Sequence, residues 1–488
     1  MAQLIRKADT TGTQESSWAH SPLLVGILAG LFALSGGVVL AFGGPLAAAA
    51  LIFAGIAAVV VLRNLEMGFW GVIAVITLLP FATLPIDIGI TPTFLDVALG
   101  AVVGVWLLRL ASGRQRTIVT APITVPLLVF IVLAVFAFIF GLNNGPLTPT
   151  LLRHFAELLL SLAFVLVVVD YAQSWRHLER LVQALLLMGA VAALVGIVLW
   201  ALPEETANQA LNALQRVGYP GGWVIRYVEE NPELAERAIG TSVDPNSFGG
   251  LLVLVGALAG PQLVARKPLF SRFLTALIAG LVFVALVLTL SRGAMVALIA
   301  GLGFVALARY RRLLPYMVFA GLLFLLLPVA QGYVARFVEG LRGQDLATQM
   351  RFGEYLDALT LIARYPLFGV GFAGSPDIDI YLGVASVYLT IAQQMGLLGL
   401  IAFLLLMLTV LGYAFFNRHH FRRHAHLDAI WLGLHAALIG GLVAGIFDHY
   451  LFNINFHHAV TLFWLIVGMA TAATRLGTQE ALALAGDE

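Results

Sequence analysis

Apolar stretches long enough to cross a lipid bilayer follow one another along almost the whole chain. A helix of about 20 mainly apolar residues spans the hydrocarbon layer of roughly 30 Å. With 60% hydrophobic residues, 11% charged residues and a mean hydropathy of +0.96, the chain is far more apolar than a soluble protein. We therefore predict an all-α polytopic membrane protein.

About fourteen apolar runs are candidate membrane-spanning helices. They cover residues 22–42, 45–62, 67–83, 92–110, 122–141, 150–169, 180–201, 247–265, 273–290, 293–308, 313–329, 396–416, 428–447 and 457–474. The chain shows no long internal repeat and no separate soluble domain, so we predict one transmembrane domain over residues 21–475 between tails at 1–20 and 476–488. Residues 1–20 lack the arrangement of a cleaved signal peptide, and the first run is expected to be retained.

Basic residues fall on alternate connections between these runs, and such residues favour the cytoplasmic side of a membrane. The basic connections contain Arg6, Lys7, Arg63, Arg109, Arg114, Arg116, Arg176, Arg180, Arg266, Lys267, Arg272, Arg309, Arg311, Arg312, Arg418, Arg422, Arg423 and Arg475. This pattern predicts a multi-pass membrane protein with both termini on the cytoplasmic side. The lipid bilayer is then an expected partner, and nucleic acid is not.

Two outward connections are long, at about 202–246 and 330–395, and long loops on a compact scaffold often carry binding and chemistry. Both contain stretches with apolar residues near helical spacing, at 205–217 and 345–369. These stretches predict helices that lie in the headgroup layer or fold over the spans as a cap. The alternative is a solvated connector without function.

The predicted outward cations are all arginines: Arg153, Arg216, Arg226, Arg237, Arg292, Arg336, Arg342, Arg351 and Arg364. A guanidinium donates two parallel hydrogen bonds and keeps its charge at any working pH, so it suits a diphosphate better than lysine does. Arg292 lies between two apolar runs, where an arginine needs either water or an anion. The chain contains no cysteine, so its outward loops have no disulfides.

Four short motifs occur in order between Arg237 and Phe403. They are Arg237-Ala-Ile-Gly240 with Asp244-Pro245-Asn246, Ser291-Arg292-Gly293, Arg351 and Tyr355 with YPLFGVGFAG (365–374), and VYLTIAQQMGLLGLIAF (387–403). Together they resemble the O-antigen ligase and O-antigen polymerase superfamily of membrane glycosyltransferases. The resemblance implies a GT-C-like helical fold and a transferase that passes a glycan from a polyprenyl diphosphate (undecaprenyl diphosphate type) donor to a sugar or lipid-linked acceptor. The resemblance implies that the reaction takes place at the outer face of the bacterial cytoplasmic (inner) membrane.

The resemblance also implies that Arg237, Arg292 and Arg351 bind the donor diphosphate. Breaking the sugar–phosphate bond leaves negative charge on the departing diphosphate, and fixed cations aimed at that charge lower the barrier. Arg292 is therefore also a candidate catalytic residue.

These motifs have structural interpretations as well. Arg292 could cap the helix before it, because C-terminal carbonyls attract cations. Arg237 and Arg351 could instead pair with glutamates nearby in the sequence, namely Glu233, Glu236 and Glu354. The Asp244-Pro245-Asn246 triplet predicts the start of a helix with Asn246 as its cap.

The chain departs from the superfamily at the general base. Family members usually carry a histidine shortly before a tyrosine-leucine pair, here Tyr388-Leu389, and this chain has Ala385 in that place. Alanine cannot accept a proton. Candidate replacements at the outer face are Asp448, His449, His457 and His458, because histidine is well matched to proton transfer near neutral pH.

We expect no cofactor and assign no metal site. Asp377 and Asp379 form an Asp-x-Asp motif, which can hold a divalent metal through carboxylate oxygens. A solvated loop is the simpler interpretation of that motif.

Four ionisable residues lie near the outer ends of two predicted spans: Asp96, Arg153, His154 and Glu157. Arg153 and Glu157 are four residues apart and share a helical face. Ionisable groups at membrane depth are costly and usually face the protein interior or a wet cavity. These residues predict a polar cavity open to the outside, which suits a lipid-linked sugar donor and equally a proton-coupled transporter.

Two alternatives to a transferase remain. A transporter or flippase of lipid-linked saccharides would need ionisable groups distributed through the spans to both faces, whereas here they concentrate near the outer end. A non-catalytic family member that binds such glycans would be consistent with Ala385 in place of the histidine. Within the transferase class, ligase and polymerase both remain open.

Overall fold

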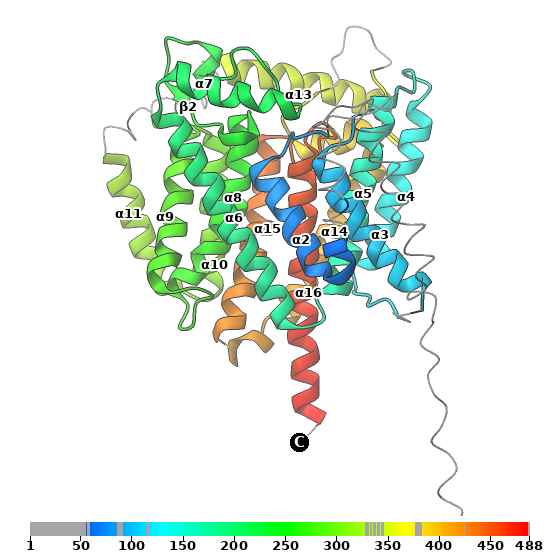
Figure 1. The fold of residues 1–488 in the computed structure, drawn as a ribbon, viewed down its shortest axis with the longest axis vertical. Helices are drawn as coiled ribbons and strands as arrows, with labels where there is room; N and C mark the ends of the chain where they lie inside the picture. The colour runs from blue at the N-terminus through cyan, green and yellow to red at the C-terminus, as the bar shows by residue number, and fades with distance from the viewer. Residues whose placement is uncertain are drawn as a thin grey trace, which may run out of the picture.

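The computed structural model is almost entirely helical (Figure 1). It describes residues 59–84, 91–113, 117–326, 346–375, 383–423 and 425–486, with the single positions 55, 331, 334, 338 and 342. The α-helices are α2 (Leu65–Leu78), α3 (Phe94–Ala111), α4 (Thr124–Gly141), α5 (Pro149–Tyr171), α6 (Trp175–Ala201), α7 (Glu204–Asn212), α8 (Pro245–Val264), α9 (Arg272–Leu288), α10 (Arg292–Ala308), α11 (Leu314–Leu326), α13 (Leu346–Arg364), α14 (Val387–Asn417), α15 (Ala425–Phe447) and α16 (His457–Gly486). Two short antiparallel strands, β1 (Arg226–Tyr227) and β2 (Glu236–Arg237), complete the fold.

Apolar helices dominate the described residues. Eight are long and apolar enough to cross a membrane (α3, α4, α5, α6, α8, α14, α15 and α16), and α2, α9, α10 and α11 are shorter apolar helices. Each coincides with a predicted run, as expected of an all-α polytopic membrane protein. The predicted runs 22–42 and 45–62 lie wholly or largely outside the described residues. The count of fourteen and the GT-C-like arrangement therefore stay predictions.

Helices α8, α15 and α16 form the interior of the bundle. Their most apolar windows are 83%, 72% and 100% buried, against 28% for α3 and 33% for α4, which face outward. Small residues let the inner helices approach closely, as is usual in lipid. A Cβ added to Gly249 of α8 would lie 3.0 Å from the Cβ of Ala294 of α10, and one added to Gly301 of α10 would lie 2.7 Å from the carbonyl oxygen of Ala436 of α15. This packing holds the N-terminal ends of α8 and α10 side by side.

The predicted outward segment 202–246, here called the cap, covers one end of the bundle (Figure 1). Together with Ala82, which follows α2, it forms a small hydrophobic core made of Ala207, Leu211, Tyr219, Val224, Ile225, Tyr227, Ile239 and Val243. Side chains of α7 hold its turns: Asn208 Oδ1 accepts from the Val224 N–H at 2.9 Å, and Asn212 Oδ1 accepts from the Gly222 N–H at 3.0 Å. The cap is therefore an ordered element.

Helix α13 lies across the same end of the bundle as the cap (Figure 1). Its apolar residues Phe352, Leu356 and Leu359 are more than half exposed, whereas Ala358 and Leu361 on the other face are fully buried. Exposed apolar residues at this spacing are typical of a helix in the headgroup layer of a membrane. Both predicted helical stretches of the outward connections are thus helices.

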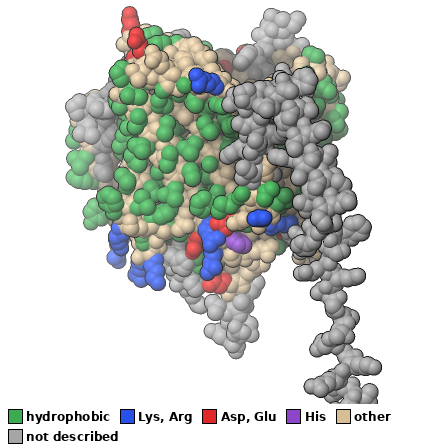
Figure 2. Space-filling model, viewed as in Figure 1, with side chains coloured by type: hydrophobic (Ala, Val, Ile, Leu, Met, Phe, Trp, Pro, Cys, Tyr) green, Lys and Arg blue, Asp and Glu red, His purple; other side chains and the backbone are tan. Residues whose placement is uncertain are grey.

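Most basic side chains visible in Figure 2 gather at the end of the bundle opposite α7 and α13. Two arginines of the predicted cytoplasmic connections form ion pairs: Arg180 lies 2.6 Å from Glu66, and Arg309 lies 2.7 Å from Asp428. This segregation of charge is the pattern from which we predicted the orientation. The assignment of that end to the cytoplasm stays a prediction.

The predicted connection 330–395 is too long, because α14 begins at Val387 and not at 396. The apolar run restarts at a break in the helix, where Gly396 has φ +69° and ψ −175°. The break leaves backbone N–H and carbonyl groups of α14 without partners inside the helix. Residues after α13 form hydrogen bonds with these groups. The Val370 N–H donates to the Gln393 carbonyl at 2.9 Å, and the Leu397 N–H donates to the Pro366 carbonyl at 2.7 Å. These bonds tie α13 to the bundle.

We predict that Gly396→Ala destabilises the protein. Its backbone angles belong to a region that essentially only glycine adopts, at a cost of order 1–3 kcal/mol for other residues, and the added Cβ would lie 2.2 Å from the Leu367 carbonyl oxygen. Gly412→Ala in the same helix is the control, since nothing lies within 4 Å of its added Cβ. Thermal unfolding in detergent should show a lower Tm for Gly396→Ala alone, and equal Tm values would contradict the account of the break.

Candidate functional site

Three arginines from separate elements line one cavity beside the cap, here called the arginine cavity. Arg237 comes from β2, Arg292 from the first turn of α10 and Arg351 from α13. The cavity has a volume of about 160 Å³, whereas a single water needs only about 10–15 Å³. The structure thus brings the three sequence-predicted arginines together.

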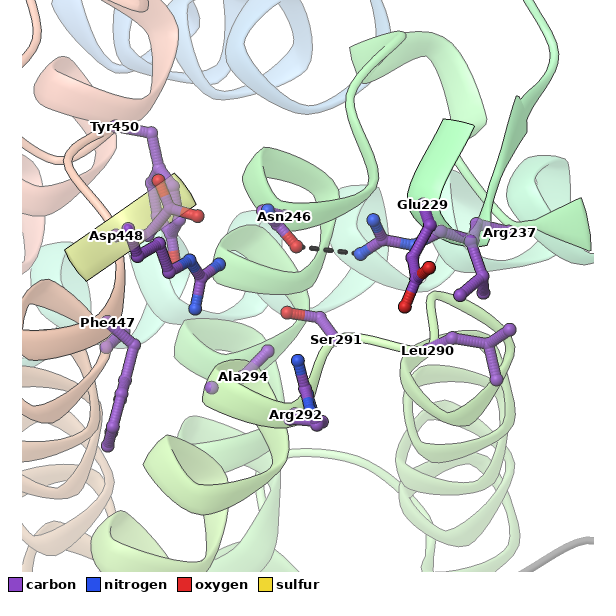
Figure 3. Close-up of a pocket in the computed structure, with 14 residues that line it drawn as sticks. Glu229, Arg237, Asn246, Leu290, Ser291, Arg292, Ala294, Phe447, Asp448 and Tyr450 are labelled. Atoms are coloured by element: carbon purple, nitrogen blue, oxygen red, sulfur yellow. Dashed lines mark hydrogen bonds between the residues drawn. The ribbon is translucent and has the colours of Figure 1, made fainter. Parts of the chain in front are cut away.

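Two carboxylates share the arginine cavity with these cations. Figure 3 shows Arg237 and Glu229 on one side, Phe447, Asp448 and Tyr450 on the other, and Asn246, Ser291 and Arg292 between them. Three guanidinium groups against the carboxylates of Glu229 and Asp448 leave a formal charge of +1. The cavity is therefore suited to an anion that carries at least one negative charge.

Arg237 is held by the ends of two helices. Its Nε donates to the Thr289 carbonyl at the end of α9 at 2.9 Å, and its terminal nitrogen donates to Asn246 Oδ1 at 2.8 Å. These partners replace the expected pairing with nearby glutamates. Burial lowers the pKa of the Arg237 guanidinium, and Arg351 lowers it further, while Asp244 and Asp448 oppose the shift. An anion in the cavity would relieve this cost of burying charge.

Asp244, and not Asn246, caps α8. The Asp244 side chain accepts a hydrogen bond from the Ser247 N–H at 2.6 Å, and Pro245 occupies the first helical position. The helix begins where the triplet predicted. Its expected cap residue was wrong, because Asn246 lies in the first turn and binds Arg237 instead.

The N-terminus of α10 forms one wall of the arginine cavity. Arg292 is the first residue of the helix, and the preceding Ser291 makes no side-chain capping hydrogen bond. The first amides of a helix carry partial positive charge, so a cation at this position is unfavourable and an anion is favourable. The backbone amides and the Arg292 charge therefore favour the same kind of ligand.

Arg351 is available to a ligand. Among the residues that the structure describes, its half-buried guanidinium makes no hydrogen bond or ion pair. The expected pairing with Glu354, three residues later on α13, is not formed. Glu354 Oε2 instead accepts from the Ala385 N–H at 3.0 Å.

Backbone strain is concentrated around the arginine cavity. The non-glycine residues with positive φ in the described part of the chain are Glu229, Glu230, Val243 and Leu290, with φ between 54° and 58°. Glu229 and Leu290 line the cavity, and Val243 directly precedes the cap residue of α8. Each such conformation costs of order 1–3 kcal/mol and is found most often at functional sites. No local sequence pattern predicts these conformations.

A second polar cluster lies between α3, α5 and α16. His457 Nδ1 is 3.5 Å from Asp96 Oδ1 and 3.9 Å from Glu157 Oε2. Arg153 Nε lies 3.5 Å from Glu157 Oε1, and Arg153 also contacts His154 at 2.8 Å. Asp96, Arg153 and Glu157 line a cavity of about 660 Å³. The four predicted cavity residues are thus neighbours, and they lie apart from the arginine cavity.

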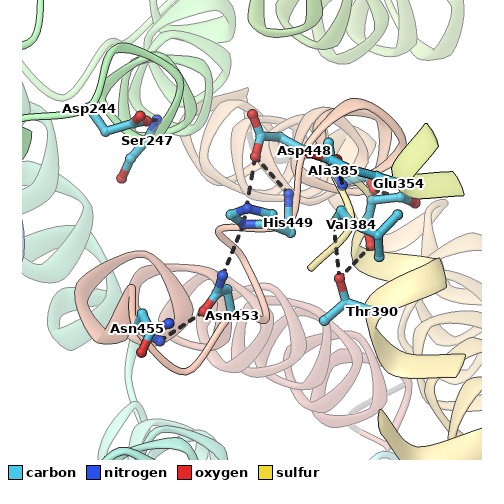
Figure 4. A network of polar contacts seen from close by, with 12 residues as sticks. Asp244, Ser247, Glu354, Val384, Ala385, Thr390, Asp448, His449, Asn453 and Asn455 are labelled. Carbon is cyan, nitrogen blue, oxygen red and sulfur yellow. Dashed lines mark hydrogen bonds and ion pairs between the residues drawn. The ribbon is translucent and has the colours of Figure 1, made fainter. Parts of the chain in front are cut away.

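The four candidate bases lie in one segment, residues 448–458. Asp448 lines the arginine cavity and accepts from the His449 N–H at 2.8 Å (Figure 4). The His449 ring contacts Asn453 at 3.2 Å. His458 is buried against Ser247 of α8 at 3.0 Å, and His457 belongs to the second cluster. Only Asp448 of the four lines the arginine cavity.

Residues 274–404, which include two of the three arginines of the cavity, match the family model described as O-Antigen ligase. This segment is similar to the O-antigen ligase family, and the match supports membership of the O-antigen ligase superfamily. Arg292 and Arg351 lie within the matched segment, and Arg237 and Asp448 lie outside it. Comparison with curated proteins gives no match. Membership implies glycan transfer of the O-antigen ligase type in general terms.

At Ala385, where members of the superfamily usually carry histidine, α13 fills the adjacent space. Besides the Glu354 contact, the Tyr355 hydroxyl donates to the Ala385 carbonyl at 3.2 Å. A carboxylate therefore lies beside the position of the missing imidazole (Figure 4). Sequence reasoning missed Glu354 and Glu229 as site residues. The candidate metal residues Asp377 and Asp379 lie outside the described residues.

Glu236, next to Arg237 in β2, makes the cap sensitive to pH. Burial, together with a smaller contribution from the neighbouring Glu204, raises the pKa of its carboxyl to about 7. The raised pKa means that the folded cap favours the protonated acid. This stabilisation is fully present below the ordinary value of 4.5 and is lost as pH rises through about 7.

We predict that Glu236→Gln removes this pH dependence. The variant should match the wild type near pH 4.5 and become the more stable of the two above pH 7, because glutamine stays neutral. The Tm of both proteins between these pH values is the measurement. Glu233→Gln, at an exposed position of the same turn, is the control. A constant Tm difference across the pH range would contradict the prediction.

Proposed function

We propose that the protein transfers a glycan from a polyprenyl diphosphate donor to a sugar or lipid-linked acceptor, as an O-antigen polymerase or ligase does. The observation that carries this proposal is the convergence of Arg237, Arg292 and Arg351 on one cavity. The family match supports the reaction class. The exposed apolar face of α13 supports a site at the membrane surface, where a lipid-linked donor would lie.

In this proposal the arginine cavity binds the diphosphate. The acceptor hydroxyl attacks the anomeric carbon of the donor sugar, and the bond from that carbon to the diphosphate oxygen breaks. The electron pair leaves with the polyprenyl diphosphate, whose new negative charge is stabilised by the three guanidinium groups and the N-terminal amides of α10. Arg237 is positioned by Thr289 and Asn246, so little reorganisation accompanies the reaction.

Asp448 is our candidate for the base that takes the proton of the acceptor hydroxyl. It faces the arginine cavity, and the N–H of His449 orients one of its oxygens. A base in the cavity must lie within hydrogen-bond reach of the proton that it removes. The other three candidates do not line the cavity. His449 adjoins Asp448, and its Nδ1 lies 3.8 Å from the carboxylate.

We propose the orientation that the basic residues predict, with the cap and α13 on the extracytoplasmic side and both termini in the cytoplasm. The arginine cavity then lies at the outer face of the cytoplasmic membrane. The described spans and the cap form a single transmembrane domain in this proposal.

Arg292→Ala should slow glycan transfer by about 10²–10³-fold, the usual effect of removing one donor to a developing anion. The assay follows release of polyprenyl diphosphate from a lipid-linked oligosaccharide by purified protein. Arg216→Ala, at an exposed position of the cap outside the cavity, should keep wild-type rates. An Arg292→Ala enzyme with wild-type turnover would refute the assigned role.

The same preparation separates transfer from the alternatives. Translocation of the lipid-linked saccharide across vesicles without diphosphate release would indicate a transporter or flippase. Binding without release or translocation, for every acceptor offered, would indicate a non-catalytic protein. Product length distinguishes polymerase from ligase.

Asp448→Asn should lower turnover by about 10²–10⁴-fold, the range for loss of a general base. Asparagine keeps an oxygen that can accept from the His449 N–H, so binding of the donor should change little. Asp357→Asn on α13, outside the cavity lining, is the matched control. Near-normal turnover of Asp448→Asn would exclude Asp448 as the base.

A further inference from the structure

Asp96, Glu157 and His457, here called the acid–histidine cluster, come from three helices that are far apart in the sequence. One ligand atom from each residue lies within 4.8 Å of the other two. His457 is 8% exposed and Glu157 is 4% exposed, so neither side chain has free access to water. Buried ionisable groups in a membrane protein require partners.

His457 lacks the hydrogen bonds that a buried imidazole normally forms, and so does one oxygen of Glu157. Both ring nitrogens of His457 and the Oε1 atom of Glu157 are buried without a hydrogen-bond partner. The gaps of 3.5 Å to Asp96 and 3.9 Å to Glu157 exceed the range of about 2.7–3.2 Å for a hydrogen bond from nitrogen to oxygen. His457 thus faces both carboxylates without a hydrogen bond to either.

The separations of 3.5 and 3.9 Å between His457 and the two carboxylates are close to those between ligands of one metal ion. A tetrahedral Zn²⁺ with bonds of about 2.1 Å holds its ligand atoms about 3.4 Å apart. We propose that Asp96, Glu157 and His457 bind a divalent transition-metal cation, through Asp96 Oδ1, Glu157 Oε2 and His457 Nδ1.

The donor set indicates which cation fits. One imidazole nitrogen with two carboxylate oxygens suits Zn²⁺ or Mn²⁺. It provides too few oxygens for Ca²⁺, which takes about 6–8. The two carboxylates also offset the charge of the ion.

Neighbouring groups orient the ligands. Asp96 Oδ2 accepts from the Thr93 N–H at 2.7 Å in the capping box of α3, which leaves Oδ1 facing His457. Arg153 lies 3.5 Å from Glu157 Oε1, which leaves Oε2 facing His457. Such outer contacts fix metal ligands in place. Because Asp96 and Glu157 also line the cavity of about 660 Å³, the remaining coordination positions of the ion face that cavity.

Metal content of the purified protein tests the proposal without an activity assay. After treatment with a chelator, the protein is titrated with Zn²⁺, Mn²⁺, Mg²⁺ and Ca²⁺, and bound metal is measured by mass spectrometry. We expect one Zn²⁺ or Mn²⁺ per chain and no retained Ca²⁺. Co²⁺ bound to the wild type should show the d–d absorption of a low-symmetry site, a readout that needs no variant.

Glu157→Gln and Asp96→Asn should each weaken binding by more than the roughly 10–100-fold that loss of an outer contact costs. Glu66→Gln is the matched control, because Glu66 is another buried glutamate that pairs with an arginine, 2.6 Å from Arg180. It should bind metal as the wild type does. Two results would overturn the proposal: a wild type that binds none of these ions, in which case the carboxyl groups share a proton, or a Glu157→Gln protein with unchanged affinity and Co²⁺ spectrum.

Discussion

The structure at the cap end of the bundle depends on the positive charge that is concentrated in the arginine cavity. Arg237, Arg292 and Arg351 arrive from three elements, and the first amides of α10 add partial positive charge at the same place. Charges of one sign repel, and Glu229 and Asp448 compensate for them only in part. Such an arrangement persists only where the surrounding backbone is held firmly, and it leaves the cavity ready for an anion.

The bundle supplies that support through close backbone contacts. The approach of Gly249 to Ala294 sets the N-termini of α8 and α10 beside each other, and Arg237 bridges the helix ends through Asn246 and Thr289. The break at Gly396 serves the third arginine, because the residues after α13 complete the hydrogen bonds of α14. Because the protein interior has little free volume, such tight packing fixes the positions of the arginines.

One short segment, residues 448–458, connects the two polar regions. Asp448 faces the arginine cavity, His458 packs against α8, and His457 faces Asp96 and Glu157. The adjacent residues His457 and His458 at the start of α16 therefore contact different groups, because successive residues of a helix point in different directions. Residues 448–458 thus contribute to both the proposed donor site and the proposed cation site.

The sequence by itself determined the helices, since apolar runs of this length satisfy their backbone only as spans in lipid, and it ordered the arginines by their motifs. It also indicated that Arg153 and Glu157 share a helical face, because helical spacing is a local property, and it placed Asp96 near the same end of another predicted span. Tertiary structure alone decided that Arg237 contacts Asn246, that Glu354 lies beside Ala385, and that His457 completes a cluster with Asp96 and Glu157. Those contacts depend on how distant helices pack, and a one-dimensional pattern does not contain that information.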